Sequence, residues 1–125
     1  MSIMAQFHFL QGNINHCARA QDLLLQSMAE WSIHVAVVAE PYLVPARDNW
    51  LGCADGLVAI IGEALTEPSR GRGWVAAVSG GIVIVGAYFS PNKNLADFEG
   101  FLGELGTVVG RYHPRPVLVL GDFNA

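Results

Sequence analysis

The run IHVAVVA at residues 33–39, followed directly by Glu40 and Pro41, decides the fold class of this chain. It is short, rich in β-branched residues and apolar throughout, which favours a strand buried on both faces. Residues 17–31 precede it with apolar side chains at helical spacing, and residues 6–14 (QFHFLQGNI) have the pattern of another strand. Strand, helix and strand in this order predict a βαβ unit with two parallel neighbouring strands, and therefore an α/β protein.

The rest of the chain adds strands and one more helix. Apolar runs predict strands at 57–62, 74–78, 82–89 and 117–121, and helical spacing predicts a helix over 95–112. Residues 40–56 have the composition of a long loop, EPSRGRG (67–73) of a flexible basic connection, and Ser79-Gly80-Gly81 of a tight hairpin. The sequence has no internal repeat and no interdomain linker, which predicts one domain.

The composition excludes several classes of protein. Of the 125 residues 52% are hydrophobic and 14% are charged, and the formal net charge is −4. A disordered chain would be poorer in apolar residues, and a nucleic-acid module recognisable from charge alone would be basic. No apolar run reaches the ~18 residues of a membrane span, and no signal peptide is recognisable, so we expect an intracellular protein without a membrane partner. Cys17 and Cys53 make no disulfide framework and have no metal-ligand spacing, and both are expected to be buried small apolar residues.

Polar residues stand at the carboxyl ends of the most apolar strands. Asn13 and Asn15 end the first strand, Glu40 the second, and Asp122 and Asn124 the last. In sheets built from βα units these ends form the ligand edge, so we expect Asn13, Glu40 and Asp122 to meet at one edge of a shared sheet. Converging carboxylates attract a hard cation such as Mg²⁺. Taken singly, each residue is explained as well by a turn or a solvated strand end.

Four motifs occur in an order typical of one superfamily: LQGNIN (10–15), VVAEP (37–41), GAYFSPN (86–92) and VLVLGDFN (117–124). With them the chain resembles the endonuclease/exonuclease/phosphatase superfamily, above all the endonuclease domain of non-LTR retrotransposons. The resemblance covers essentially the whole chain and implies part of a DNase I-like four-layer α/β sandwich. Members continue past GDFN with further strands and a late Ser-Asp-His motif, so residues 1–125 are expected to be the N-terminal portion of such a domain.

The resemblance implies a metal site. Glu40 matches the principal ligand of Mg²⁺, for which Mn²⁺ is an alternative. Asn13 matches an asparagine that helps to order the metal and the phosphate, and Asn15 matches a second position on the metal side.

It also implies catalytic roles at the later motifs. Tyr88 matches the tyrosine that contacts the scissile phosphate. Asp122 matches the carboxylate that orients or deprotonates the attacking water, and Asn124 matches the amide that holds the phosphate oxygens.

The function implied is that of a DNA endonuclease that nicks target DNA in the nucleus, so that the free 3′ hydroxyl primes reverse transcription by the rest of a longer polyprotein. Arg70 and Arg72 are candidate DNA contacts, although a solvated loop is the commoner explanation for such residues. Two alternatives stay open. One is a phosphoesterase of the same fold that acts on another substrate, such as a phosphoinositide or a sphingolipid. The other is a non-catalytic remnant that serves as a binding or assembly module.

A last expectation concerns which faces of the apolar sheet the two predicted helices cover. The helices at 17–31 and 95–112 are expected to cover one face of the sheet and to leave the other face bare. Each uncovered Val, Ile or Leu forgoes roughly 1.5–3 kcal/mol of burial. The isolated chain is therefore expected to be marginally stable and to self-associate. It is not expected to nick DNA at a useful rate, because the late His and Asp that the resemblance implies are missing.

Overall fold

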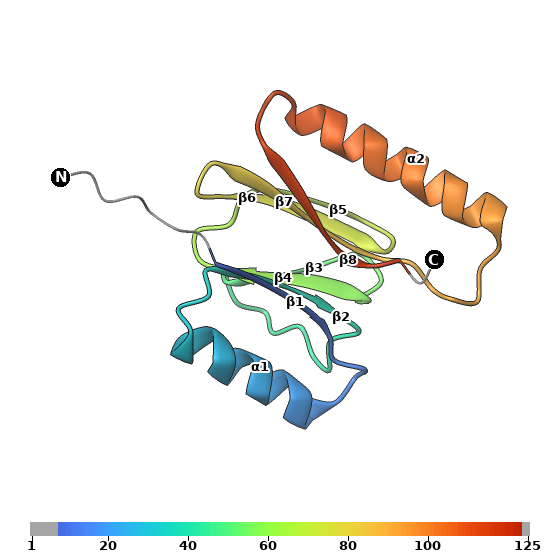
Figure 1. Cartoon of the computed structure of the whole chain (residues 1–125). Helices are drawn as coiled ribbons and strands as arrows, with labels where there is room; N and C mark the ends of the chain where they lie inside the picture. The colour runs from blue at the N-terminus through green and yellow to red at the C-terminus, as the bar shows by residue number, and fades with distance from the viewer. Residues whose placement is uncertain (1–7, 124–125) are drawn as a thin grey trace.

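The computed structural model describes residues 8–123, which form two four-stranded sheets and two helices (Figure 1). The strands are β1 (Phe9–Asn13), β2 (Val35–Ala39), β3 (Trp50–Gly52), β4 (Val58–Gly62), β5 (Thr66–Gly71), β6 (Trp74–Ser79), β7 (Ile82–Tyr88) and β8 (Val117–Asp122). The helices are α1 (Ala18–Glu30) and α2 (Leu95–Tyr112). One sheet has the order β1-β2-β4-β3 and the other β5-β6-β7-β8. Neither of these helices is long and apolar enough to cross a membrane.

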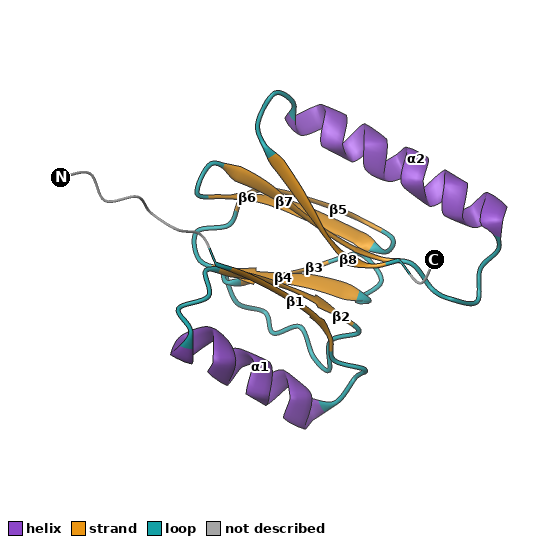
Figure 2. Ribbon diagram, viewed as in Figure 1, coloured by secondary structure: helices purple, strands orange, loops and turns teal. Residues whose placement is uncertain are grey.

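The two sheets face each other, and one helix lies on the outer side of each sheet (Figure 2). Alternate side chains of the central strands build the core between the sheets, among them Val37, Ile60 and Ile84. The intervening side chains face outward, where Val38 packs in the cluster that contains Leu24 of α1. Central strands are thus covered on both faces, which explains why their sequences are apolar at every position.

Each sheet contains one pair of parallel strands that a helix connects. β1 pairs with β2 through α1, and β7 pairs with β8 through α2. The predicted βαβ unit is therefore confirmed, and both helices lie where the apolar spacing placed them. The second pair sets Tyr88 opposite Asp122 in register.

Two segments differ from the sequence prediction. The stretch 40–56, predicted as a loop, contains the three-residue strand β3, which pairs antiparallel with β4. EPSRGRG, predicted as a flexible connection, forms most of β5. β5 is an outer strand that pairs only with β6, and its register shifts between Thr66 and Ser69. An outer strand with such an irregularity tolerates a proline, so Pro68 is compatible with β5.

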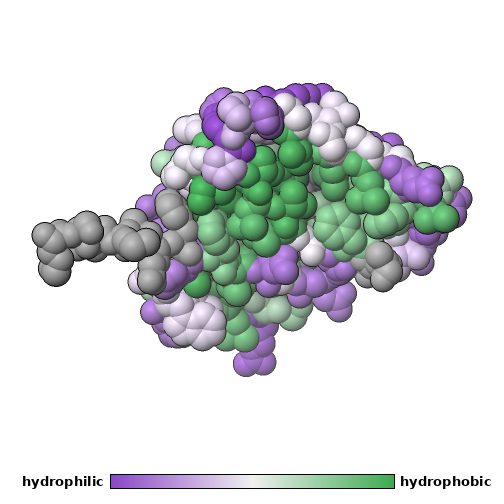
Figure 3. Space-filling model, turned by 45° about the horizontal axis from the view of Figure 1, so that its top comes forward, coloured by the Kyte–Doolittle hydropathy of each residue, from purple (hydrophilic) through white to green (hydrophobic). Residues whose placement is uncertain are grey.

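The expectation of a bare sheet face is wrong. The helices cover opposite outer sides, and each sheet buries the inner face of the other (Figures 1 and 2). Apolar exposure lies instead along β8, an outer strand whose Val119 is 40% exposed. Its side chains contribute to the green area in the middle of Figure 3. The described residues therefore retain the burial that the expectation counted as lost.

Candidate functional site

Four residues singled out from the sequence converge at one end of the molecule. Asn13 ends β1 and Glu40 follows β2 in one sheet, whereas Tyr88 and Asp122 end β7 and β8 in the other. The Tyr88 hydroxyl donates to Glu40 Oε1 at 2.6 Å, and Asn13 Nδ2 donates to Asp122 Oδ2 at 3.3 Å. The prediction of a single shared sheet is thus wrong. The residues meet because two sheets face each other and end at the same place.

Glu40 reaches the other sheet because its backbone departs from the strand. Alternation along β2 puts Ala39 on the inner face, so a regular continuation would turn the next side chain toward α1. Glu40 has φ 49°, a left-handed conformation that costs a non-glycine residue roughly 1–2 kcal/mol. Its N–H donates to Leu57 O at 2.8 Å, which holds this conformation. The half-buried carboxylate can then accept from Tyr88.

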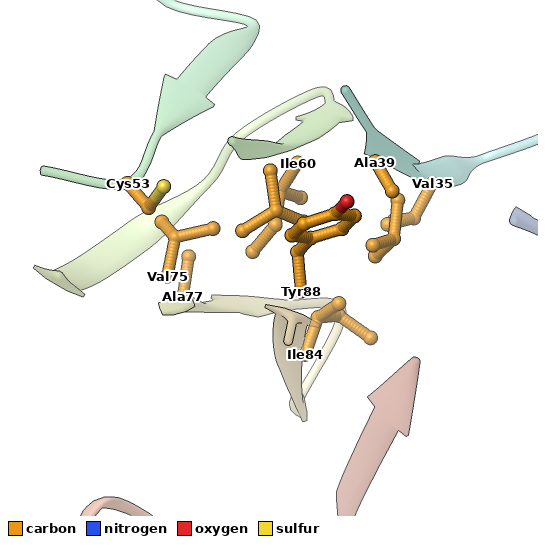
Figure 4. Close-up of a cluster of buried hydrophobic side chains, with 10 residues drawn as sticks. Val35, Ala39, Cys53, Ile60, Val75, Ala77, Ile84 and Tyr88 are labelled. Carbon is orange, nitrogen blue, oxygen red and sulfur yellow. The ribbon is translucent and has the colours of Figure 1, made fainter. Parts of the chain in front are cut away.

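Tyr88 has an apolar ring and a polar tip in different surroundings. The ring lies in the core between the sheets, near Ile60 and Ala39, and only 8% of the residue is exposed (Figure 4). The hydrogen bond to Glu40 raises the Tyr88 pKa to about 12, with further contributions from burial and from the negative charges of Glu40 and Asp122. The phenol is therefore protonated at neutral pH and serves as a hydrogen-bond donor.

The Asn13 side chain is held at both ends. Its Oδ1 accepts from the backbone N–H of Asn15 at 2.7 Å, which leaves Nδ2 to donate to Asp122. Asn15 has φ 52°, so the chain turns sharply just after Asn13. A small cavity of about 230 Å³ opens beside this pair, lined by Gln11, Gly12, Asn13, Val37, Ala39, Gly121 and Asp122.

Gln11 is a residue that the sequence interpretation missed. Its Oε1 accepts from the backbone N–H of Gly121 at 2.9 Å. Its position in the sequence could have identified it. Gln11 lies between Phe9 and Asn13 on the face of β1 toward the other sheet, where an apolar residue would be expected.

The two candidate arginines lie apart from each other. Arg72 lines a cavity of about 380 Å³ together with Tyr88, whereas Arg70 lines a different cavity with Trp50. Asn124 lies outside the described residues. Both cysteines are free thiols. Cys53 is buried, as expected, whereas the expectation of burial is wrong for Cys17, which is exposed at the residue before α1.

The donor set at the strand ends consists of oxygen and amide groups. Within residues 8–123, no group of three or more His, Cys, Asp or Glu side chains is placed to hold a metal ion. Mg²⁺ does not require three ligating side chains, because it binds through one or two carboxylates and completes its coordination shell with water and phosphate oxygens. Glu40 and Asp122 are hard donors of this kind, so the residues present fit Mg²⁺ but not a closed transition-metal site.

Comparison with known proteins establishes the fold. The endonuclease domain of TRAS1, a telomere-specific non-LTR retrotransposon, superposes with a TM-score of 0.74 and 23% sequence identity, over 96% of this chain and 60% of that chain. The chain is also 30% identical over 98 residues to the acyltransferase uat1 of Mycosarcoma maydis. That match covers 78% of this chain and 18% of uat1. No family model matches the sequence. The predicted likeness to a retrotransposon endonuclease domain is confirmed for the fold.

Proposed function

We propose that the chain carries the core of a Mg²⁺-dependent phosphodiesterase that nicks DNA, of the kind found in non-LTR retrotransposons. The observation that carries this proposal is the convergence of Asn13, Glu40, Tyr88 and Asp122 from two sheets at one end of the molecule. The shared fold with the TRAS1 endonuclease domain supports it. In the proposal, the complete domain is a four-layer α/β sandwich of the DNase I type.

Glu40 is the proposed principal ligand of Mg²⁺, or of Mn²⁺ in its place. Asn13 and Asn15 lie on the same side and are proposed to order the water and phosphate around the ion. A cation bound there supplies the positive charge that offsets the charge developing on the phosphate oxygens.

Asp122 is the proposed group that orients or deprotonates the attacking water. Asn13 Nδ2 already holds one of its oxygens, which fixes the direction of the carboxylate. Tyr88, protonated at neutral pH, is the proposed donor to a non-bridging phosphate oxygen. Asn124 is proposed to hold the phosphate from the chain that follows β8.

The proposed substrate is duplex DNA, and the proposed product is a nick with a 3′ hydroxyl that primes reverse transcription in the nucleus, with a reverse transcriptase in the same polyprotein. Arg72 is the better placed of the two arginines for a phosphate contact, because it shares a cavity with Tyr88. The net charge of −4 predicts weak non-specific affinity for DNA.

The similarity to the acyltransferase uat1 raises the question of acyl transfer, but the buried thiol of Cys53 does not support that activity. Burial and the hydrogen bond to Asp55 raise the Cys53 pKa, whereas an acyl-accepting cysteine needs a lowered pKa. The chain spans 18% of uat1, so the activity in that protein's name stays with that protein.

The test uses the 125-residue chain in two measurements. The first is Mn²⁺ binding, followed by paramagnetic broadening of the amide signals of Asn13 and Gly121. The second is relaxation of supercoiled plasmid by excess protein over hours, in Mg²⁺ and in EDTA. Glu40→Gln and Asp122→Asn are compared with Glu63→Gln, an exposed acid beyond the end of β4.

We expect Glu40→Gln to lower Mn²⁺ affinity at least tenfold and both site variants to abolish nicking, with Glu63→Gln unchanged. Mn²⁺ binding that both site variants leave intact would overturn the site. A phosphoinositide assayed beside the plasmid under the same conditions distinguishes the remaining outcomes. A chain that binds Mn²⁺ at Glu40 but cleaves neither substrate is a binding module, and cleavage of the phosphoinositide in place of the plasmid would make the substrate a lipid.

A further inference from the structure

A pair of side-chain hydrogen bonds links β1 to β8, the outer strands of two different sheets. Strands of different sheets share no ladder of backbone hydrogen bonds, so their relative position depends on side chains. Gln11 Oε1 accepts from Gly121 N at 2.9 Å, and Asn13 Nδ2 donates to Asp122 Oδ2 at 3.3 Å. Gln11 and Asn13 are alternate residues on the same face of β1. Gln11 bonds the backbone of Gly121 and Asn13 bonds the side chain of Asp122, the next residue of β8.

The Gly121 N–H points away from its own sheet. The carbonyls of Pro116 and Asp122, an even number of residues apart, both accept N–H groups from the β7 side, those of Val83 and Phe89. Because successive residues of a strand direct their backbone groups to opposite sides, the Gly121 N–H lies on the open side of β8. Gln11 is the group that satisfies this N–H.

On the side opposite Gln11, close contact with β7 restricts the movement of β8 at Gly121. A Cβ placed on Gly121 would lie 1.9 Å from the carbonyl oxygen of Ala87, so the two backbones approach as closely as glycine allows. The strand is therefore held by β7 on one side and by the Gln11 side chain on the other. Asp122 is the next residue, so its carboxylate is positioned through the same two contacts.

We propose that Gln11 is a positioning residue of the site. Through Gly121 it holds the end of β8 against β1, and it thereby keeps the Asp122 carboxylate beside Asn13 and Glu40. This inference rests on the proposed function, because it assigns Gln11 to the cation and water site of that function. Gln11 itself touches neither the carboxylate nor, in this proposal, the reacting atoms.

The test uses the ¹⁵N-labelled 125-residue chain with three substitutions. Gln11→Met keeps the length of the side chain and removes the acceptor, whereas Gln11→Glu keeps an acceptor oxygen. Gln26→Met is the matched control, because Gln26 is exposed on α1 and its side-chain amide donates to Glu30 one turn further along the same helix. Hydrogen exchange of the Gly121 amide reports the hydrogen bond, and Mn²⁺ broadening of the Asn13 side-chain amide reports the site.

In Gln11→Met we expect the Gly121 amide to exchange at least tenfold faster, with the Val85 amide in β7 unchanged. Gln11→Glu should retain the protection of Gly121. The Mn²⁺ concentration for half-broadening should rise at least threefold in Gln11→Met and stay constant in Gln26→Met. If Gln11→Met does not fold, Gln11→Asn, whose carbonyl is one methylene shorter, takes its place in both measurements.

Two results would overturn the positioning role. One is an unchanged exchange rate of Gly121 in the variant without the acceptor. The other is faster exchange with an unchanged Mn²⁺ response, which would make the bond structural only. A wild-type chain that does not bind Mn²⁺ overturns the proposed function and the positioning role with it, while the exchange rates still decide whether the hydrogen bond exists.

Discussion

The Tyr88 hydroxyl donates a 2.6 Å hydrogen bond to Glu40, and this bond joins the two sheets at the end where the candidate residues meet. Tyr88 also lies in register with Asp122 on the neighbouring strand. The proposed metal ligand and the proposed phosphate donor are therefore bonded to each other in the chain alone. Because the phenol has a single O–H, donation to a phosphate oxygen requires this hydrogen bond to break, which makes the tyrosine a reporter of phosphate at the site.

The ionisation of Tyr88 gives the first prediction. We expect Tyr88 to titrate near pH 12, as followed by tyrosinate absorbance, and Tyr88→Phe should remove that step. Because the Tyr88 pKa is higher in the folded than in the unfolded chain, its hydrogen bond contributes to the free energy of unfolding in full below the unfolded pKa of about 10. That contribution is lost as the pH rises toward 12. Glu40→Gln should lower the Tyr88 pKa, because the carboxylate charge is gone. If the step that Tyr88→Phe removes lies near pH 10, the hydrogen bond to Glu40 is contradicted.

Gly121→Ala is expected to destabilise the chain. The new methyl group would overlap the Ala87 carbonyl oxygen, which belongs to the backbone and cannot turn aside, so β8 must move away from β7. We expect the free energy of unfolding in urea to fall by about 2–3 kcal/mol. An unchanged urea midpoint would show that the two strands are further apart than described.

Gly106→Ala should have the opposite effect. Gly106 lies in the interior of α2, is exposed, and offers open space to an added Cβ. Alanine lowers the conformational entropy of the unfolded chain, so we expect a gain of about 0.5–1 kcal/mol in the free energy of unfolding. Urea unfolding measures it, and a loss of stability would mean that this face of α2 is covered.

The two thiols should differ in reactivity toward a disulfide reagent at pH 8. Cys17 is exposed and should react at once. Cys53 is 6% exposed, and burial followed by the hydrogen bond to Asp55 raises its pKa, so it should react only after unfolding. Cys17→Ser isolates the slow thiol, and fast labelling of that variant would contradict the burial of Cys53.

Local patterns in the sequence were sufficient for much of the fold. The apolar runs at 33–39 and 82–89 predicted β2 and β7, and the helical spacing at 95–112 matches α2 residue for residue. These elements are set by periodicity, because a buried strand or an amphipathic helix needs the same side-chain pattern wherever it packs. β3 and β5 were missed, because neither strand shows an apolar run in the sequence: β3 has three residues, and β5 (TEPSRG) is polar and mostly exposed.

The sequence by itself determined which polar residues end the strands, and the tertiary structure alone decided how they meet. Nothing local shows that Asn13 and Asp122, 109 residues apart, belong to different sheets and share a hydrogen bond. The same holds for Gln11 and Gly121, whose bond arises only where β1 and β8 lie face to face. Contacts between sheets depend on long-range packing of the core, because only that packing sets the distance between strands that share no backbone hydrogen bonds.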